Sequence, residues 1–210
     1  MSKFEYRGFY QNYDMEGEII IGTGKVKVHD IFEPLPDFMR TADCIFVDPP
    51  CNNGNLKSFY TKSDKLLKLD YPRFEKRLFD VIDEINPNHL FIEVFASNKE
   101  SIFEKLSERY GANIKEFPSY YYHKEDNKCW IYYAYLKENN FEIPFLDEEK
   151  AIEFICGNLE FDTIADPCMG KGLVGFYANK FGKKFAGTEL NKKRLACLLE
   201  HINKGKIIVR

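Results

Sequence analysis

The chain has 210 residues, of which 44% are hydrophobic and 30% are charged, and its formal net charge is −3. This composition fits one globular domain over residues 1–210 and excludes a low-complexity chain. No apolar stretch approaches the roughly 20 residues that span a bilayer, and the N-terminus lacks the apolar region of a signal peptide, so we expect a cytoplasmic protein without a membrane partner. Its six cysteines lack paired spacing, which predicts reduced thiols and no metal site.

Predicted strands and helices alternate along the chain, which is typical of an α/β domain with a mostly parallel sheet. In chain order, the pattern predicts strands at 19–21, 25–28 and 43–47, a long loop at 51–70, a helix at 72–85, a strand at 90–95 and a helix from 97 or 98 to 110. It continues with strands at 114–122 and 129–136, a helix at 147–156, a strand at 163–166, a helix through 181, a strand at 184–189 and a helix at 192–203.

Local patterns predict how some of these elements pack. Residues 19–28 indicate a hairpin or an interrupted strand, because glycines divide them. The helix that ends at 110 is expected to turn Ile102, Phe103 and Leu106 inward. The two aromatic-rich strands between 114 and 136 flank a charged turn, which predicts an antiparallel hairpin at the sheet edge whose tyrosines pack within the sheet rather than against bases.

The glycine-rich segment 166–172 has the sequence DPCMGKG and lies between a predicted strand and a predicted helix. Its two glycines allow a sharp turn and a close approach of the backbone to a ligand. About 20 residues later the next strand ends in Glu189, whose carboxylate can accept hydrogen bonds from both hydroxyls of a ribose. Together, these features predict a nucleoside-binding site.

The same segment also fits the dinucleotide fingerprint G-x-G-x-x-G, because Gly175 supplies the third glycine. Asp166, however, places a carboxylate just before the turn. A carboxylate at that position attracts the ammonium of a methionine group and repels a pyrophosphate. The residues therefore favour a cofactor with a methionine end over a dinucleotide.

A second motif, residues 47–51 with the sequence VDPPC, follows the short apolar strand. An aromatic amine is a weak nucleophile, because its lone pair is delocalised into the ring. Asp48 and the carbonyl of Pro49, held rigid by adjacent prolines, could accept both N–H bonds of such an amine and direct its lone pair at a methyl donor. The alternative is an ordinary turn at a strand end, and the combination of both motifs favours methyl transfer.

With both motifs in this order, the chain resembles the β group of DNA amino-methyltransferases, over residues 26–55 and 145–202. The resemblance implies a Rossmann-like methyltransferase fold, in which a mostly parallel sheet has an antiparallel edge hairpin and helices on both faces, and it implies S-adenosylmethionine as the cofactor. The implied catalytic residues are Asp48, Pro49, Pro50 and Cys51. The implied cofactor-binding residues are Asp166, Pro167, Cys168, Gly170, Gly172, Glu189 and Asn191.

The resemblance implies methyl transfer to an exocyclic amino group of a nucleic-acid base, and the Asp that opens the motif favours N6 of adenine in DNA. Cys51 stands where the family has an aromatic ring that stacks on the flipped base, and Phe59 or Tyr60 could stack instead. Residues 56–144 barely complete the sheet and leave no room for a separate target-recognition region. Recognition is therefore expected to be slight, or to come from a homodimer or a partner protein.

Three other functions remain open on the sequence. Cys51 after a proline matches the nucleophile of a cytosine C5 methyltransferase, although Asp48 and the order of the motifs disfavour it. A catalytically impaired methyltransferase-like subunit that binds nucleic acid or a partner protein would fit Cys51 and the negative net charge. The same motif also supports methylation of RNA or of another amine substrate.

Overall fold

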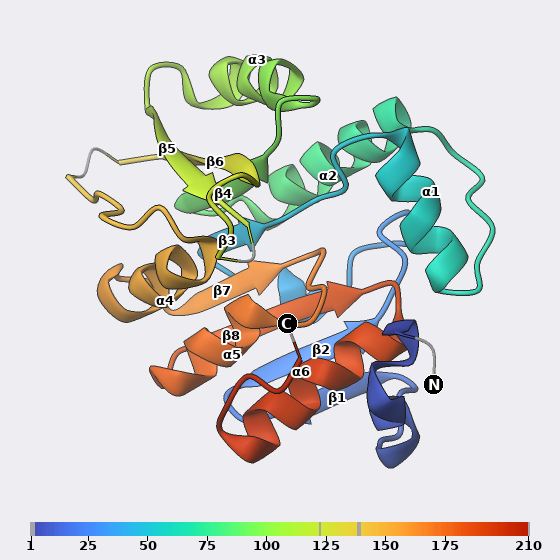
Figure 1. The fold of residues 1–210 in the computed structure, drawn as a ribbon. Coiled ribbons are helices and arrows are strands. Elements are labelled where there is room, and N and C mark those ends of the chain that lie inside the picture. The colour runs from blue at the N-terminus through green and yellow to red at the C-terminus, as the bar shows by residue number, and fades with distance from the viewer. Residues whose placement is uncertain (1–2, 122, 138–139, 210) are drawn as a thin grey trace.

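Figure 1 shows the computed structural model, which describes residues 3–121, 123–137 and 140–209. The described strands form one sheet in the order β1-β2-β8-β7-β3-β4-β6-β5. They are β1 (Glu18–Ile21), β2 (Gly24–Val28), β3 (Cys44–Val47), β4 (His89–Val94), β5 (Ile114–Tyr120), β6 (Lys128–Tyr135), β7 (Thr163–Asp166) and β8 (Lys184–Glu189). The α-helices are α1 (Asn53–Lys62), α2 (Tyr71–Ile85), α3 (Lys99–Tyr110), α4 (Glu148–Asn158), α5 (Leu173–Lys180) and α6 (Lys192–Lys204), and the 3₁₀ segments are η1 (Lys3–Asn12) and η2 (Asp37–Met39).

The centre of the sheet is parallel, because β2, β8, β7, β3 and β4 all run in one direction. At one edge β1 joins β2 as an antiparallel hairpin, which decides between the two predictions for residues 19–28. At the other edge β5 and β6 form a second antiparallel hairpin that pairs with β4 through β6. The predicted mostly parallel sheet with an antiparallel edge hairpin is confirmed.

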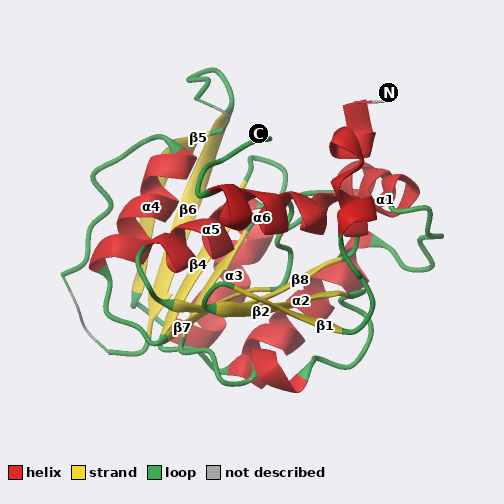
Figure 2. Cartoon of the chain, turned by 90° about the horizontal axis from the view of Figure 1, so that it is seen from below, coloured by secondary structure: helices red, strands yellow, loops and turns green. Residues whose placement is uncertain are grey.

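Helices cover both faces of the sheet, as predicted (Figures 1 and 2). On one face, α4, α5 and α6 bury a core that includes Ile155 and Leu198. On the other, α2 and α3 bury a core that includes Leu78 and Ile102, and α1 adds Leu56 to it. Burial from both sides explains why β3 consists of the four buried residues CIFV without polar alternation. None of the described helices is both long enough and apolar enough to cross a membrane.

Residues 51–70 are not the continuous loop that their polar sequence predicts, because α1 lies within them. Asn52 caps this helix by accepting a hydrogen bond from the Asn55 N–H at 2.9 Å. Within α1, only Leu56 and Tyr60, one turn apart, are buried. Two apolar positions in ten residues are too weak a pattern to indicate a helix, so α1 depends on its cap and its tertiary contacts.

One detail of the other elements differs from the sequence predictions, and a second lies outside the described residues. The sequence predicts that Phe103 faces inward from α3, but it is 45% exposed and its ring centroid lies 5.7 Å from that of Tyr132. Ile102 and Leu106 are buried as predicted, and because a helix turns by about 100° per residue, Phe103 points away from them. Tyr122, the predicted end of a strand, lies outside the described residues.

Asp43, just before β3, ties this strand to β7. Its carboxylate accepts hydrogen bonds from the N–H groups of Asp162 at 3.1 Å and Thr163 at 2.9 Å, and its own N–H donates to the Thr163 carbonyl at 3.1 Å. These bonds fix how β3 and β7 lie beside each other. Asp48 and Asp166 both lie at the other end of this parallel strand pair from Asp43, so the same bonds place the two acids next to one another.

We expect Asp43→Ala to lower the free energy of unfolding by about 2 kcal/mol, because a charged acceptor is lost and two N–H groups lose their partner. Asp162→Ala is the matched control, since this neighbouring side chain is exposed, and it should change stability by less than about 0.5 kcal/mol. Urea unfolding followed by circular dichroism measures both variants. Equal stability of Asp43→Ala and the wild type would contradict the role given to Asp43.

Candidate active site

Carboxylates line the edge of the sheet at which the parallel strands end. Asp30 follows β2, Glu189 ends β8, Asp166 ends β7, Asp48 follows β3 and Glu93 lies near the end of β4. The strand order places these acids in that sequence along the edge. The structure therefore brings together Asp48, Asp166 and Glu189, which the sequence predicts for the site. It adds Asp30 on one side of them and Glu93 on the other. This edge of an open parallel sheet is where α/β folds bind ligands.

Two adjoining pockets open at this edge, and both are lined by Asp48, Cys168 and Arg194. The first, here called the loop pocket, encloses about 730 Å³ of empty space, part of it open to solvent. It is lined mainly by residues 147–149 and 168–174. The second, called the strand pocket, encloses about 580 Å³. It is lined mainly by residues 29–31, 48–50 and 189–190.

Glu189 holds the glycine-rich loop in place. Its two carboxylate oxygens accept hydrogen bonds from the N–H groups of Gly170 at 2.7 Å and Asn191 at 2.9 Å. Gly170 and Gly172, which line the loop pocket, have φ values of 57° and 81°, a region that favours glycine. A Cβ on Gly172 would lie 2.5 Å from Cβ of Leu198 in α6. Gly172 is therefore required for packing of the loop against α6, a reason that the sequence does not reveal.

The other residues predicted to bind the cofactor differ in their access to the pockets. Pro167 lines the strand pocket, and Cys168 lines both pockets. Asn191 lines neither: its side chain accepts a hydrogen bond from the Lys193 N–H and donates one to the Lys62 carbonyl, each at 2.9 Å. It thus caps α6 and ties that helix to the end of α1. Its contact with a cofactor stays a prediction.

The second motif divides between the pockets and the surface. Pro49 and Pro50 line the strand pocket beside Asp48. Cys51, one of six free thiols, lines neither pocket, and its sulfur lies 2.6 Å from Oδ1 of Asn55 at the start of α1. The motif therefore presents one carboxylate on a rigid support, with the thiol turned toward α1.

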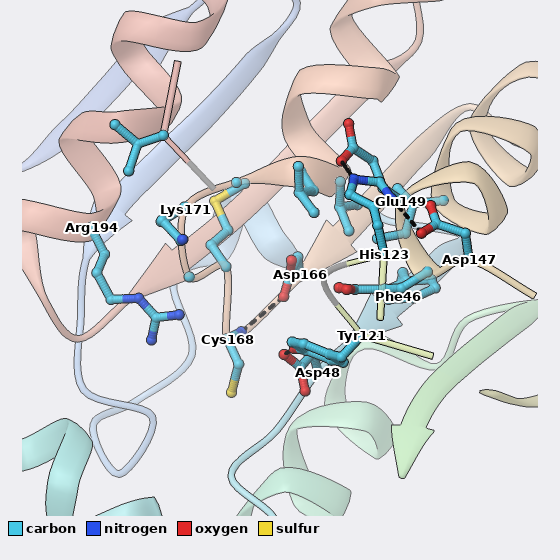
Figure 3. Close-up of a pocket in the computed structure, with 18 residues that line it drawn as sticks. Phe46, Asp48, Tyr121, His123, Asp147, Glu149, Asp166, Cys168, Lys171 and Arg194 are labelled. Atoms are coloured by element: carbon cyan, nitrogen blue, oxygen red, sulfur yellow. Dashed lines mark hydrogen bonds and ion pairs between the residues drawn. The ribbon is translucent and has the colours of Figure 1, made fainter. Parts of the chain in front are cut away.

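The β5–β6 hairpin contributes two side chains to the loop pocket that sequence reasoning missed (Figure 3). The hydroxyl of Tyr121 donates a hydrogen bond to Oδ2 of Asp48. His123 lies between two acids at the start of α4, with Nδ1 2.5 Å from Asp147 and Nε2 3.2 Å from Glu149. The sequence predicts strand packing for Tyr121, because no local pattern distinguishes it from the neighbouring tyrosines.

Two basic residues also line the loop pocket, Lys171 from the glycine-rich loop and Arg194 from α6, and both are labelled in Figure 3. The guanidinium carbon of Arg194 lies 5.0 Å from the ring centroid of Phe59 in the strand pocket. Burial raises the pKa of both Asp48 and Glu189, and the positive charge of Arg194 opposes that rise. Lys171 lies inside a recognisable motif, whereas no sequence pattern identifies Arg194.

Asp48, Glu93 and Glu148 form a carboxyl cluster in which oxygens of all three side chains lie within 4.8 Å of one another. Burial raises the pKa of Asp48 to about 7, and burial together with the nearby carboxylates raises that of Glu148 to about 8. Burial also raises the pKa of Glu93 well above its usual range, and neither of its oxygens has an N–H or O–H partner among the described residues. Protons or a cation must offset the charge of such a cluster.

This cluster makes stability depend on pH. A carboxyl whose pKa rises on folding binds its proton more tightly in the folded state than in the unfolded state. The folded protein therefore holds extra protons between the usual carboxyl pKa near 4.5 and about pH 8, and the contribution of the cluster to stability falls as pH rises through that window.

Relative to the wild type, the free energy of unfolding of Glu93→Gln should increase by about 1 kcal/mol or more as pH rises from about 5 to about 8, because one pKa unit corresponds to about 1.4 kcal/mol. The amide keeps the shape of the protonated acid and cannot ionise. Chemical unfolding at a series of pH values measures the difference, with the exposed Glu125→Gln as control. A stability difference that does not change with pH would contradict the raised pKa of Glu93.

Comparison with known proteins identifies the fold as that of the DNA methyltransferases, and the predicted Rossmann-like methyltransferase fold is confirmed. The M1.HpyAVI–SAM complex matches with a TM-score of 0.55 and 17% identity over 84% of this chain and 99% of its own. PvuII DNA methyltransferase, described as cytosine-N4-specific, matches with a TM-score of 0.56 and 10% identity over 85% and 86%. TTHA0409, a protein from Thermus thermophilus, matches with a TM-score of 0.51 and 13% identity over 79% and 87%. No protein-family model and no curated protein sequence matches the chain.

Proposed function

We propose that the protein transfers a methyl group from S-adenosylmethionine to an exocyclic amino group of a nucleic-acid base, and that the base is adenine, methylated at N6, in DNA. The observation that carries this proposal is the position of Asp48, which lines both pockets and lies beside the glycine-rich loop. A cofactor held by the loop and an amine bound to Asp48 would therefore be neighbours. The similarity to M1.HpyAVI and to the PvuII enzyme, described as a cytosine-N4-specific DNA methyltransferase, supports the same chemistry.

The strand pocket fits a nucleoside. Ile31, Phe59 and Leu190 offer apolar surface for a purine ring. Asp30 and Glu189 offer carboxylates for its polar groups, and the Glu189 oxygens, each of which already accepts one N–H bond, retain lone pairs for ribose hydroxyls. We infer that this pocket holds the adenosine part of the cofactor.

The loop pocket fits the methionine part. Asp166 and Glu148 offer carboxyl oxygens to an ammonium group, and Lys171 offers positive charge to a carboxylate. A pyrophosphate would meet the acids instead, which disfavours a dinucleotide. When bound, S-adenosylmethionine supplies an electrophilic methyl group on a positively charged sulfur, and acidic surroundings suit that charge.

The chain's own residues activate the amine. The Asp48 carboxylate and the Pro49 carbonyl accept the two N–H bonds, which draws the nitrogen lone pair out of the ring and orients it. The nitrogen must lose one proton when it gains the methyl group, and Asp48 is the acceptor. Because the pKa of Asp48 is raised to about 7, the carboxylate is basic enough to take up this proton near neutral pH.

The position of Cys51 favours amino-methylation over a cytosine C5 mechanism, because its thiol faces Asn55 outside both pockets. An Asp at the start of the motif supports adenine, and a cytosine N4 product would decide for the alternative base. Residues 56–121 form most of α1 together with α2, β4, α3 and β5, so this part of the chain is used to build the fold and leaves no separate target-recognition region. We therefore assign recognition of a target sequence to a second copy of the chain or to a partner protein.

We expect Glu189→Ala to weaken binding of S-adenosylhomocysteine by about 10- to 100-fold, because a charged acceptor of ribose bonds is lost and the glycine-rich loop loses its anchor. Calorimetry measures the affinity, and the exposed Glu160→Ala is the control. Unchanged affinity in Glu189→Ala would remove Glu189 from the cofactor site.

We expect Asp48→Ala to reduce methyl transfer by about 100-fold or more while cofactor affinity stays within a few-fold, because the target amine loses its acceptor. The assay uses radiolabelled S-adenosylmethionine with single-stranded and duplex DNA of mixed sequence, and mass analysis of the nucleosides identifies the product. Full activity of Asp48→Ala would exclude the mechanism.

The same assay separates the other functions. Loss of activity in Cys51→Ser would favour a covalent C5 mechanism, because a hydroxyl is a far weaker nucleophile than a thiolate. Cofactor binding without methyl transfer to DNA or RNA would favour a catalytically impaired subunit or another amine substrate.

A further inference from the structure

In the free protein, the hydroxyl of Tyr121 occupies the carboxylate to which a target amine would bind. It donates a hydrogen bond to Oδ2 of Asp48, and Figure 3 shows the ring lying directly against that carboxylate. An amine that binds Oδ2 of Asp48 must therefore displace this hydroxyl. The hydrogen bond that the hydroxyl loses offsets the one that the amine gains, so the hydroxyl competes with the amine for this oxygen.

Tyr121 is held at this place by the turn of the β5–β6 hairpin. Its N–H donates to the Asn127 carbonyl at 2.9 Å, and its own carbonyl accepts from the Lys124 N–H at 3.1 Å. The contact of His123 with Asp147 anchors the same turn to the start of α4. The backbone of Tyr121 is thus fixed on both sides, which leaves rotation of its side chain as the motion that opens Asp48.

The ring of Tyr121 lies at the mouth of the loop pocket. It is partly exposed, and its centroid lies 5.4 Å from that of Phe95, with the two ring planes tilted by 50°. The two rings that the sequence suggests for stacking are engaged elsewhere, because Arg194 lies over Phe59 and the Tyr60 hydroxyl donates to Asp30 at 2.6 Å. Tyr121 is therefore the ring best placed to cover a planar group whose amine is bound at Asp48.

A base that leaves its stack needs a new stacking partner in the pocket, and an aromatic side chain supplies one. We propose that Tyr121 is a specificity-determining residue for planar aromatic amines. Its hydroxyl holds the Asp48 acceptor until the amine displaces it, and its ring then stacks on the base that carries the amine. An aliphatic amine gains only the hydrogen bond, so the site selects a nucleobase. This inference rests on the proposed function and names the residue that selects its substrate.

The first test measures methyl transfer to single-stranded DNA of mixed sequence. Tyr121→Phe keeps the ring and removes the competing hydroxyl, so KM for DNA should fall by about 2- to 10-fold, the range of one hydrogen bond. Tyr121→Ala removes both, and KM should rise by about tenfold or more, the range of a lost base stack. Tyr120→Ala is the matched control, because this neighbouring tyrosine lines a different pocket and should leave KM unchanged. Because Tyr121 also lines the loop pocket, the affinity for S-adenosylhomocysteine is measured in each variant, and KM for DNA is compared at saturating cofactor.

The second test needs no turnover. Fluorescence anisotropy measures binding of a labelled oligodeoxyadenylate and of an abasic strand of equal length, both in the presence of S-adenosylhomocysteine. Tyr121→Ala should weaken binding of the adenine strand by about tenfold, and Tyr121→Phe should strengthen it by about 2- to 10-fold. Neither variant should change binding of the abasic strand, which offers phosphates without bases.

The outcomes separate this inference from the proposed function. Equal loss on both strands, no loss in Tyr121→Ala, or weaker binding by Tyr121→Phe would overturn the role of Tyr121. Normal methyl transfer by Tyr121→Ala would overturn it as well and would leave the proposed function standing. A wild-type protein that transfers no methyl group, but whose variants show the expected strand-dependent binding, would overturn the proposed function alone.

Discussion

Five parallel strands end at one edge of the sheet, with a carboxylate at or near the end of each. The mutual repulsion of these carboxylates in a buried environment is the constraint to which the rest of the site responds. The responses differ along the row. Glu189 accepts two backbone N–H groups, Asp48 accepts the Tyr121 hydroxyl, and Arg194 lies between the two pockets that these acids line. Neither oxygen of Glu93 has an N–H or O–H partner among the described residues, and burial beside the other carboxylates raises its pKa well above the usual range.

The same row of charges determines which ligands suit the site. A sulfonium or an ammonium group would bring positive charge to carboxylates that repel one another, whereas a pyrophosphate would add to the repulsion. Binding of a cationic ligand at this edge would therefore be coupled to protonation of the carboxyl cluster, whose pKa values burial raises. Asp48 connects these effects, because it belongs to the cluster and also lines both pockets.

The β5–β6 hairpin has a second role besides closing the sheet edge. Its turn brings Tyr121 to Asp48 and His123 to the start of α4, so an antiparallel addition to the parallel sheet forms one wall of the loop pocket. The motif segment itself contributes no aromatic ring at Cys51. Tyr121, which is remote in the sequence, brings an aromatic ring to Asp48 from the hairpin. It can reach this place because the hairpin adds β6 next to β4, and β4 lies next to β3.

The sequence alone is sufficient to predict the alternation of strands and helices, the sheet class and the strand ends that carry Asp48, Asp166 and Glu189, because hydrophobic periodicity, prolines and glycines act over a few residues. It did not determine α1, which has a single buried stripe of two residues, nor the arrival of Tyr121 and Arg194 at the site. Those contacts join segments that are far apart in the chain, by 73 residues in the case of Tyr121 and Asp48. Only the order of strands in the folded sheet decides which of these distant side chains meet, and no local pattern encodes that order.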